Sequence, residues 1–315
     1  LTHSMDDGPA DSHGRSAAVI EVVGQLPAAA PALDVTVLEG GDPYAYVAAH
    51  AAGVHVVDIR DPAAPRLVRT LRTPGPALAV ANNRAYLAVA AGSAGLVLFD
   101  LADPAAPTLI STIPPSAGGN AYAAAFAGLT TAWLGEWNED FVNGDPEHGI
   151  RSVDLSDSTR TMPVGALNTP GWAADIAVQE NVAWVADGPG GLLAVDIADP
   201  AAPRPIGRLQ TSVRAYGVAV SEPYERVYVA DNEGGLLVVD GHDPTSPRAL
   251  GTLEVGGAAY DVAPDSVTSS VWVAVAKGGG PTDGGRVVWV DGLDPEHPAV
   301  FAGLDLAQRA WGVAT

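Results

Sequence analysis

Three acidic side chains stand at equivalent places in this sequence and could together hold a cation. Glu136, Asp187 and Asp231 each end a short apolar segment. Neighbouring carboxylates without compensation raise one another's pKa and favour a bound counter-ion. His50 follows another such segment, and a histidine beside carboxylates is the minimum for acid–base or metal chemistry. One hypothesis is therefore a site for Ca²⁺ or another divalent metal that serves a hydrolase or lyase.

A structural role is the competing interpretation of these acids. Asp187 and Asp231 precede tight turns, where an Asp ordinarily accepts backbone N–H bonds from the turn that follows. Glu136 fits this less well, because it precedes the long insertion WNEDFVNGDPEHG (137–149). The oxygen-rich insertion adds Asp140 and Asp145 to the candidate metal ligands. It lacks the fixed register of a calcium loop, and a solvated surface loop is the alternative explanation.

The composition excludes several other chemistries. The chain has no cysteine, which rules out disulfides, thiolate metal sites and cysteine nucleophiles. No HxH, HExxH or GxSxG motif occurs. The 37 acidic residues outnumber 16 basic ones, for a net charge of −21. This acidity disfavours binding to nucleic acid or to an anionic membrane, and no apolar run approaches the length of a membrane span.

Six aromatic residues near the same segment ends form the second candidate site. Amphipathic aromatic side chains are the usual anchors of binding sites. We expect ligand contacts from Tyr122, Trp137, Trp172, Tyr216, Tyr260 and Trp311.

Internal repeats show which elements must position these residues. The letters GLLAVDIADPAAPRPIGRL (191–209) recur in related form from residues 53, 95 and 235, with weaker copies from 149 and 285. The Asp that ends the first apolar run recurs at Asp58, Asp100, Asp154, Asp196, Asp240 and Asp291. A period of roughly 40 to 45 residues is typical of four-stranded propeller blades.

Each repeat reads as four short strands without a helical pattern. In one unit they are predicted at 174–178, 182–187, 191–197 and 204–209, which we name strands A to D. Gly190 and Gly191 suit a tight turn between B and C, and Asp199-Pro200 separates C from D. The prediction is an all-β propeller with B–C and D–A connections on one rim and strand A along the central channel.

A constant offset predicts the number of blades. The last residue of strand D lies seven residues before the residue that opens the next strand A, as in Leu209 and Tyr216. By this rule residues 19–26 are a D strand and residues 310–315 an A strand, each without the rest of its blade. We expect six complete four-stranded blades plus an incomplete seventh made of the N-terminal and C-terminal strands. Another polypeptide segment completes the seventh blade, or its two strands pair directly. Residues 1–16 are expected to be a flexible tail, and residues 17–315 a single domain.

The pattern GLLxVDIxDPxxPxxxGxL, with its A and B strands, resembles the LVIVD-repeat family of bacterial and archaeal propeller proteins. The resemblance covers residues 17–315 and is strong in four of the six complete units; in the third, Asp157-Ser158 replaces Asp-Pro. It implies a propeller that is commonly exported or on the cell surface, and it implies little about chemistry.

Two functions therefore stay open. The first is an exported or cell-surface propeller that binds a protein, glycan or small ligand through the rim of B–C and D–A loops. The alternative is a metal-assisted hydrolase or lyase with its site at the channel mouth. A signal segment would already be absent from this chain, which begins at Leu1.

Overall fold

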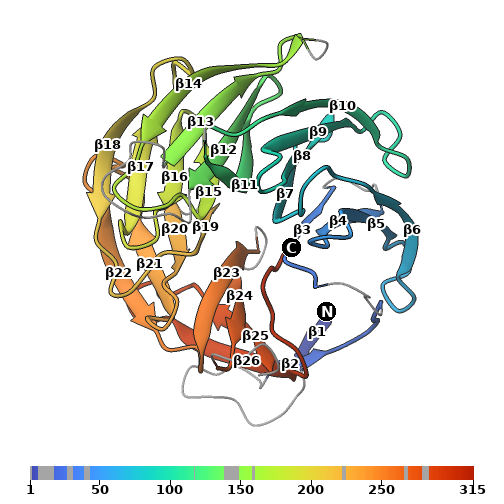
Figure 1. The fold of residues 1–315 in the computed structure, drawn as a ribbon. Helices are drawn as coiled ribbons and strands as arrows, with labels where there is room; N and C mark the ends of the chain where they lie inside the picture. Colours follow the sequence, from blue (N-terminus) through green and yellow to red (C-terminus); the bar gives the residue numbers. More distant parts are fainter. Residues whose placement is uncertain are drawn as a thin grey trace.

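A computed structural model of the chain describes residues 2–5, 18–26, 31–38, 43–116, 118–137, 149–157, 160–221, 225–265, 269–278 and 284–315. Six four-stranded antiparallel sheets are arranged as blades around a common centre (Figure 1). The predicted all-β propeller with four strands per blade is confirmed.

Within each blade the strands pair in chain order, A to D. The first three blades comprise β3 (Asp34–Val37), β4 (Tyr44–Ala48), β5 (Val54–Asp58) and β6 (Arg66–Leu71); β7 (Ala79–Asn82), β8 (Tyr86–Ala90), β9 (Leu96–Asp100) and β10 (Thr108–Ile113); and β11 (Asn120–Ala127), β12 (Thr131–Trp137), β13 (Gly149–Asp154) and β14 (Met162–Asn168). The last three comprise β15 (Asp175–Gln179), β16 (Val182–Ala186), β17 (Leu192–Asp196) and β18 (Arg204–Leu209); β19 (Gly217–Ser221), β20 (Arg226–Ala230), β21 (Leu236–Asp240) and β22 (Arg248–Leu253); and β23 (Ala258–Pro264), β24 (Ser270–Ala276), β25 (Gly285–Asp291) and β26 (Ala299–Leu306).

The repeated aspartates shape the turn between strands C and D. The carboxylate of Asp196 accepts the N–H of Ala198 at 3.0 Å, and that of Asp199 accepts the N–H of Ala201 at 3.0 Å. Such local bonds are the usual reason for Asp in turns. The same bond to the residue two positions on is made by Asp58, Asp100, Asp154, Asp240 and Asp291. Turn formation thus explains why these Asp residues recur in each repeat.

Neighbouring blades meet through apolar faces and through close backbone contacts at the perimeter. Trp184 and Val229 lie in one cluster between the fourth and fifth blades, and both are essentially buried. At the outer strand, a Cβ added to Gly207 would lie 2.0 Å from the carbonyl oxygen of Pro244 in the next blade. Only glycine leaves room for this approach.

The predicted layout of strands and connections is confirmed. Figure 1 shows the A strands β3, β7, β11, β15, β19 and β23 around the centre and the D strands at the perimeter. The B–C turn of one blade also bonds to the D–A connection that enters the next. His50 and Ala77 exchange backbone hydrogen bonds of 3.1 and 2.9 Å, and related bridges join Gly92 to Ala121, Gly188 to Ala215 and Asn232 to Ala259. These connections therefore form one rim.

The chain ends differ from the predicted strands. Strand β2 covers only Ala18–Glu21 and pairs with β1 (Thr2–Met5), so it is shorter than the predicted strand at 19–26. Residues 310–315 are not in a strand. A strand needs a hydrogen-bonded partner, and neither 22–26 nor 310–315 forms a ladder with any described residue. Among the described residues, no helix is long and apolar enough to cross a membrane.

Candidate functional site

One row of aromatic rings lies on the rim of the third and fourth blades. Tyr122 on β11 and Trp137 at the end of β12 have ring centroids 4.6 Å apart, and Trp137 stacks on Trp172 at 5.6 Å. The guanidinium of Arg214 lies 5.7 Å from the Trp172 ring centroid, a cation–π distance. Trp172 covers Gly188, where an added Cβ would lie 2.4 Å from the indole. A side chain at residue 188 would therefore displace the ring.

A second row follows the inner ends of the next blades. Tyr216 and Tyr260 have centroids 5.2 Å apart, and Tyr260 meets Trp311 edge-on at 4.8 Å. The guanidinium of Arg309 lies 5.2 Å from the Trp311 ring centroid. These distances are within the favourable range for aromatic pairs. The structure thus brings the six predicted aromatic residues together as two rows of three, and all six are partly exposed.

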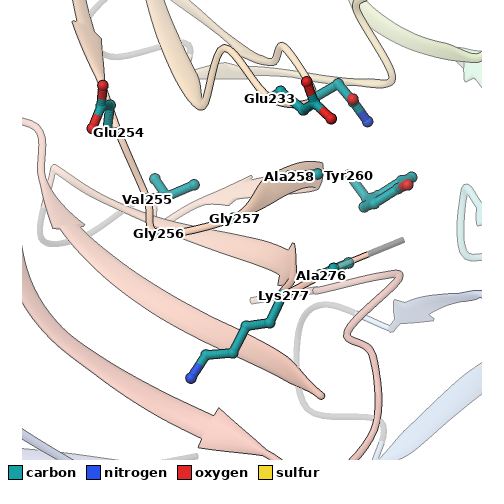
Figure 2. A pocket seen from close by; sticks show the side chains of 11 residues that line it. Glu233, Glu254, Val255, Gly256, Gly257, Ala258, Tyr260, Ala276 and Lys277 are labelled. Carbon is teal, nitrogen blue, oxygen red and sulfur yellow. The ribbon is translucent and has the colours of Figure 1, made fainter. Parts of the chain in front are cut away.

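A pocket of about 400 Å³ adjoins the second row, between the fifth and sixth blades. Tyr260, Glu233, Glu254 and Lys277 are among the residues that line it. Figure 2 shows Lys277 across the pocket from the two glutamates, with its amine directed away from them. That amine pairs with Asp305 at 2.6 Å, whereas neither glutamate has a hydrogen-bond or ion-pair partner in the described part of the chain. Two glutamates without a described ion-pair partner therefore line the pocket, with Lys277 on its other side.

Sequence reasoning did not identify Glu233 and Glu254 as site residues. Glu233 lies in the B–C turn DNEGG and Glu254 in the D–A connection after β22, so both belong to the rim that was predicted to bind. Only their positions in the repeat could have indicated them. This indication was weak, because the equivalent positions of the other blades hold residues of different types.

The three predicted rim acids are buried, and each is bonded to the D–A connection that leads into its own blade. Asp187 accepts the N–H of Gly171 at 2.8 Å. Asp231 accepts the N–H of Ser212 at 2.8 Å. The bonds come from the connection before strand A, so the interpretation that Asp187 and Asp231 serve the following turn was wrong about the partner. Burial raises the pKa of Asp187 to about 6.

Glu136 has a comparable structural role in the third blade. Its carboxylate accepts the N–H of Ser116 at 3.3 Å and also bonds to the Ser116 hydroxyl. Arg151 on β13 pairs with the other carboxylate oxygen at 2.7 Å. The carboxylate thereby joins the D–A connection to strand β13 of its own blade.

The candidate metal ligands are not assembled in the described residues. No group of three His, Asp or Glu side chains there could hold a metal ion. His50 is exposed and has a positive φ of 48°, and its backbone serves the bridge to Ala77. Asp140 and Asp145 lie outside the described residues, so the proposed role of the insertion is not tested.

Three aspartates on the inner strands were missed by the sequence reasoning. One carboxyl oxygen of Asp175 accepts the N–H of Ile176 at 2.8 Å, and the other accepts that of Val218 in the next blade at 2.9 Å. Asp34 and Asp261 make the same two kinds of bond, to Val35 and Val80 and to Val262 and Val313. The similar tripeptides LDV, ADI and YDV, which contain these three aspartates, could have indicated them in the sequence.

The same aspartates have raised pKa values. Burial raises the pKa of Asp34 to about 7, with a contribution from the charge of Asp175, and burial raises that of Asp175 to about 6. Burial, together with the charges of Asp34 and Asp175, raises the pKa of Asp261 well above its ordinary value. The backbone N–H donors counteract this increase in each case.

Sequence comparison matches the chain to a known repeat. The family described as LVIVD repeat matches residues 31–73, 74–113, 170–211 and 214–254, which together are more than half of the chain. These are the first, second, fourth and fifth blades. The third and sixth blades, which are not matched, carry the longest B–C insertions. No curated protein matches the sequence.

Solved structures share the fold at low identity. A functionally unknown protein from Desulfotomaculum acetoxidans has a TM-score of 0.68 and 12% identity, with 88% of this chain and 91% of that chain covered. A Bacteroides fragilis protein named as a candidate 6-phosphogluconolactonase has a TM-score of 0.68 and 12% identity, with 89% of this chain and 85% of that chain covered. Sqt1 from Saccharomyces cerevisiae has a TM-score of 0.59 and 10% identity, with 87% of this chain and 75% of that chain covered. Such similarity shows the fold alone.

The raised pKa values predict a stability that falls as pH rises. Asp34, Asp175, Asp187 and Asp261 keep protons in the folded state at pH values where the unfolded chain, with ordinary carboxyl pKa values, has lost them. The free energy of unfolding therefore decreases from about pH 4 to about pH 7. Urea midpoints measured across this range should decrease. The decrease should be smaller in Asp175→Asn, which removes one titrating group and also the charge that raises the pKa of Asp34 and Asp261. A midpoint that increases over this range would contradict the assignment.

Proposed function

The chain belongs to the LVIVD repeat family, and from that premise we propose that it is a binding propeller, exported or at the cell surface. Its ligand is a protein, glycan or small molecule that docks on the rim of B–C and D–A loops. One observation carries the proposal: aromatic residues from four blade positions and the C-terminal segment gather there into two rows, and one row adjoins a pocket lined by Glu233 and Glu254. Partly exposed aromatic clusters of this kind are frequent anchors of ligands.

The alternative of a metal-assisted hydrolase or lyase receives no specific support from the described residues. Its proposed carboxylates, Glu136, Asp187 and Asp231, are each bonded to the D–A connection that leads into their blade. The bonds to Ser116, Gly171 and Ser212 give each carboxylate a structural role that needs no metal. We therefore do not propose this activity as the function.

We propose further that the ring has seven blade positions, and that the chain ends occupy the seventh. An added Cβ on Gly312 would lie 2.8 Å from the Cα of Asp34, just as one on Gly217 would lie 2.8 Å from the Cα of Asp261. The Val313 N–H donates to Asp261 at 2.8 Å, the same bond that an inner strand makes in the complete blades. These contacts support residues 310–315 as a seventh inner segment between the sixth and first blades.

The outer segment supports the same proposal. An added Cβ on Gly24 would lie 2.0 Å from the carbonyl oxygen of Pro62 and 2.8 Å from Cδ of Pro65. Gly207 has the same relation to Pro244 and Pro247, at 2.0 and 3.0 Å. The apolar face of the sixth blade, which has no complete blade beyond it, is packed by Ile20, Ala310 and Val313. In Figure 1 the N-terminal strands and the C-terminal segment lie in the sector between β26 and β6.

Rim variants test the binding proposal. Wild-type protein is screened on a glycan array and on a peptide array, and the strongest probe is titrated against Trp137→Ala and Tyr260→Ala. Loss of an aromatic anchor should weaken binding by more than about tenfold. Leu109→Ala is the control, because Leu109 is 57% exposed on the outer strand β10. Unchanged melting temperatures exclude unfolding as the cause. Wild-type binding by both variants would exclude these rows as the site.

Gly312→Val tests the seventh position. The added side chain would meet the backbone of Asp34, so the free energy of unfolding should fall by roughly 1–3 kcal/mol, as expected for overpacking. Gly217→Val is the matched variant, because it has the same contact with Asp261 inside a complete blade. Both changes are measured by urea denaturation. Destabilisation by Gly217→Val with a neutral Gly312→Val would show that residues 310–315 lie outside the ring.

A further inference from the structure

The pocket beside Tyr260 is open because a small residue stands where four other blades carry a larger one. A fully buried alanine recurs where the D–A connection enters strand A, and from the second to the sixth blade it is Ala77, Ala121, Ala173, Ala215 and Ala259. The residues just before it are Pro76, Asn120, Trp172, Arg214 and Ala258. Of these five blades, the sixth alone has a side chain as small as a methyl group at this place.

The fourth blade shows what this place can hold. The indole of Trp172 lies over the B–C turn, with ring atoms 2.4 to 2.7 Å from the position of a Cβ added to Gly188. In the sixth blade, Ala258 instead pairs with Ala276 at the end of β24, and both residues line the pocket. The pocket therefore occupies the place that an indole ring fills two blades earlier.

The walls of the pocket carry hydrogen-bond acceptors on one side and a donor on the other. Glu233 and Glu254 form one wall, and no described residue makes a hydrogen bond or ion pair with either. Lys277 stands opposite, with its amine on Asp305 at 2.6 Å (Figure 2). A carboxylate only accepts hydrogen bonds and an ammonium group only donates them, whereas a hydroxyl group does both. A ligand with several hydroxyl groups is therefore complementary to both walls.

We infer that this pocket binds a neutral sugar ring of a glycan, in the place that the fourth blade fills with its own indole. The inference rests on the binding function proposed for the rim, and it names the class of ligand. Tyr260 supplies an aromatic ring beside the pocket, and the electron-rich face of such a ring attracts the C–H groups of a sugar. The volume of about 400 Å³ is within the range of small-ligand sites.

Charge and hydrogen bonding disfavour the other kinds of ligand. A carboxylated, sulfated or phosphorylated sugar would approach Glu233 and Glu254 on a protein with a net charge of −21. A cationic group would suit the glutamates but would be repelled by Lys277 on the other side. An aromatic side chain of a peptide would match the shape but would make no hydrogen bond to the carboxylates. A neutral sugar meets all three conditions.

Ala258→Trp tests the inference, because it gives the sixth blade the ring that the fourth blade already has. Ala202→Trp is the matched control, since Ala202 is exposed in a C–D turn on the other rim. Methyl glycosides of glucose, galactose, mannose and N-acetylglucosamine are titrated into each protein and followed by NMR. At least one should shift the amides of Gly257 and Ala276 in the wild type and in Ala202→Trp, and none should shift them in Ala258→Trp.

Glu254→Ala provides a second test that does not depend on how the new indole packs. Glu254 is exposed, so its removal should leave the melting temperature unchanged. Loss of a hydrogen bond to a charged group should weaken binding of the same glycoside by about tenfold or more. Wild-type affinity in this variant would overturn the proposed role of the acidic wall.

Three further outcomes would overturn the inference. Glycoside shifts that persist in Ala258→Trp would place the sugar elsewhere. N-acetyltryptophanamide that shifts the amides of Gly257 and Ala276 when no glycoside does would assign the pocket to an aromatic side chain of a peptide. If no glycoside shifts them while Trp137→Ala abolishes binding of an array probe, the sugar site fails and the binding rim stands. The proposed function fails as well only if the rim binds neither an array probe nor a glycoside.

Discussion

Aspartates on three inner strands each bond to the segment beside them at the centre of the ring. The inner strands of adjacent blades lie side by side without a shared ladder, so each blade must be held to the next by side chains, by packing and by the backbone bridges of the rim. Asp175 meets this need with one oxygen on its own blade and one on Val218 of the next. The charged form is unfavourable in this place, which is why burial raises the pKa of Asp34 and Asp175.

The regular spacing of the inner strands also explains the rim. Tyr216 and Tyr260 stand at the same place in successive blades with ring centroids 5.2 Å apart, and the Tyr260 ring also meets Trp311 of the C-terminal segment at 4.8 Å. A row of contacting aromatic side chains is therefore a direct consequence of the repeat. The rim acids serve a related purpose, since Asp187 holds the connection that carries Trp172 and Asp231 holds the one that leads to Tyr216. Scaffold and candidate site are thus built from the same repeated positions.

Local patterns made most of the fold predictable from the sequence. The predicted strand at 204–209 coincides with β18, and the predicted rim gathers the six aromatic residues. Hydrogen bonds between residues far apart in the sequence were not predictable. Nothing in the turn after Asp187 indicates that its carboxylate bonds to Gly171, sixteen residues earlier. The predicted strand at 19–26 likewise failed in part, because a ladder partner is a property of the assembled ring and not of the segment.

Amide hydrogen exchange at Val313 tests the closure of the ring most directly. Its N–H donates to Asp261 at 2.8 Å, as the N–H groups of Val80 and Val218 donate to Asp34 and Asp175 at 2.8 and 2.9 Å. If the C-terminal segment is the seventh inner position, the three amides exchange at similar slow rates in the chain alone. Exchange of Val313 at the rate of an unstructured peptide, with Val80 and Val218 protected, would show that the ring closes without it.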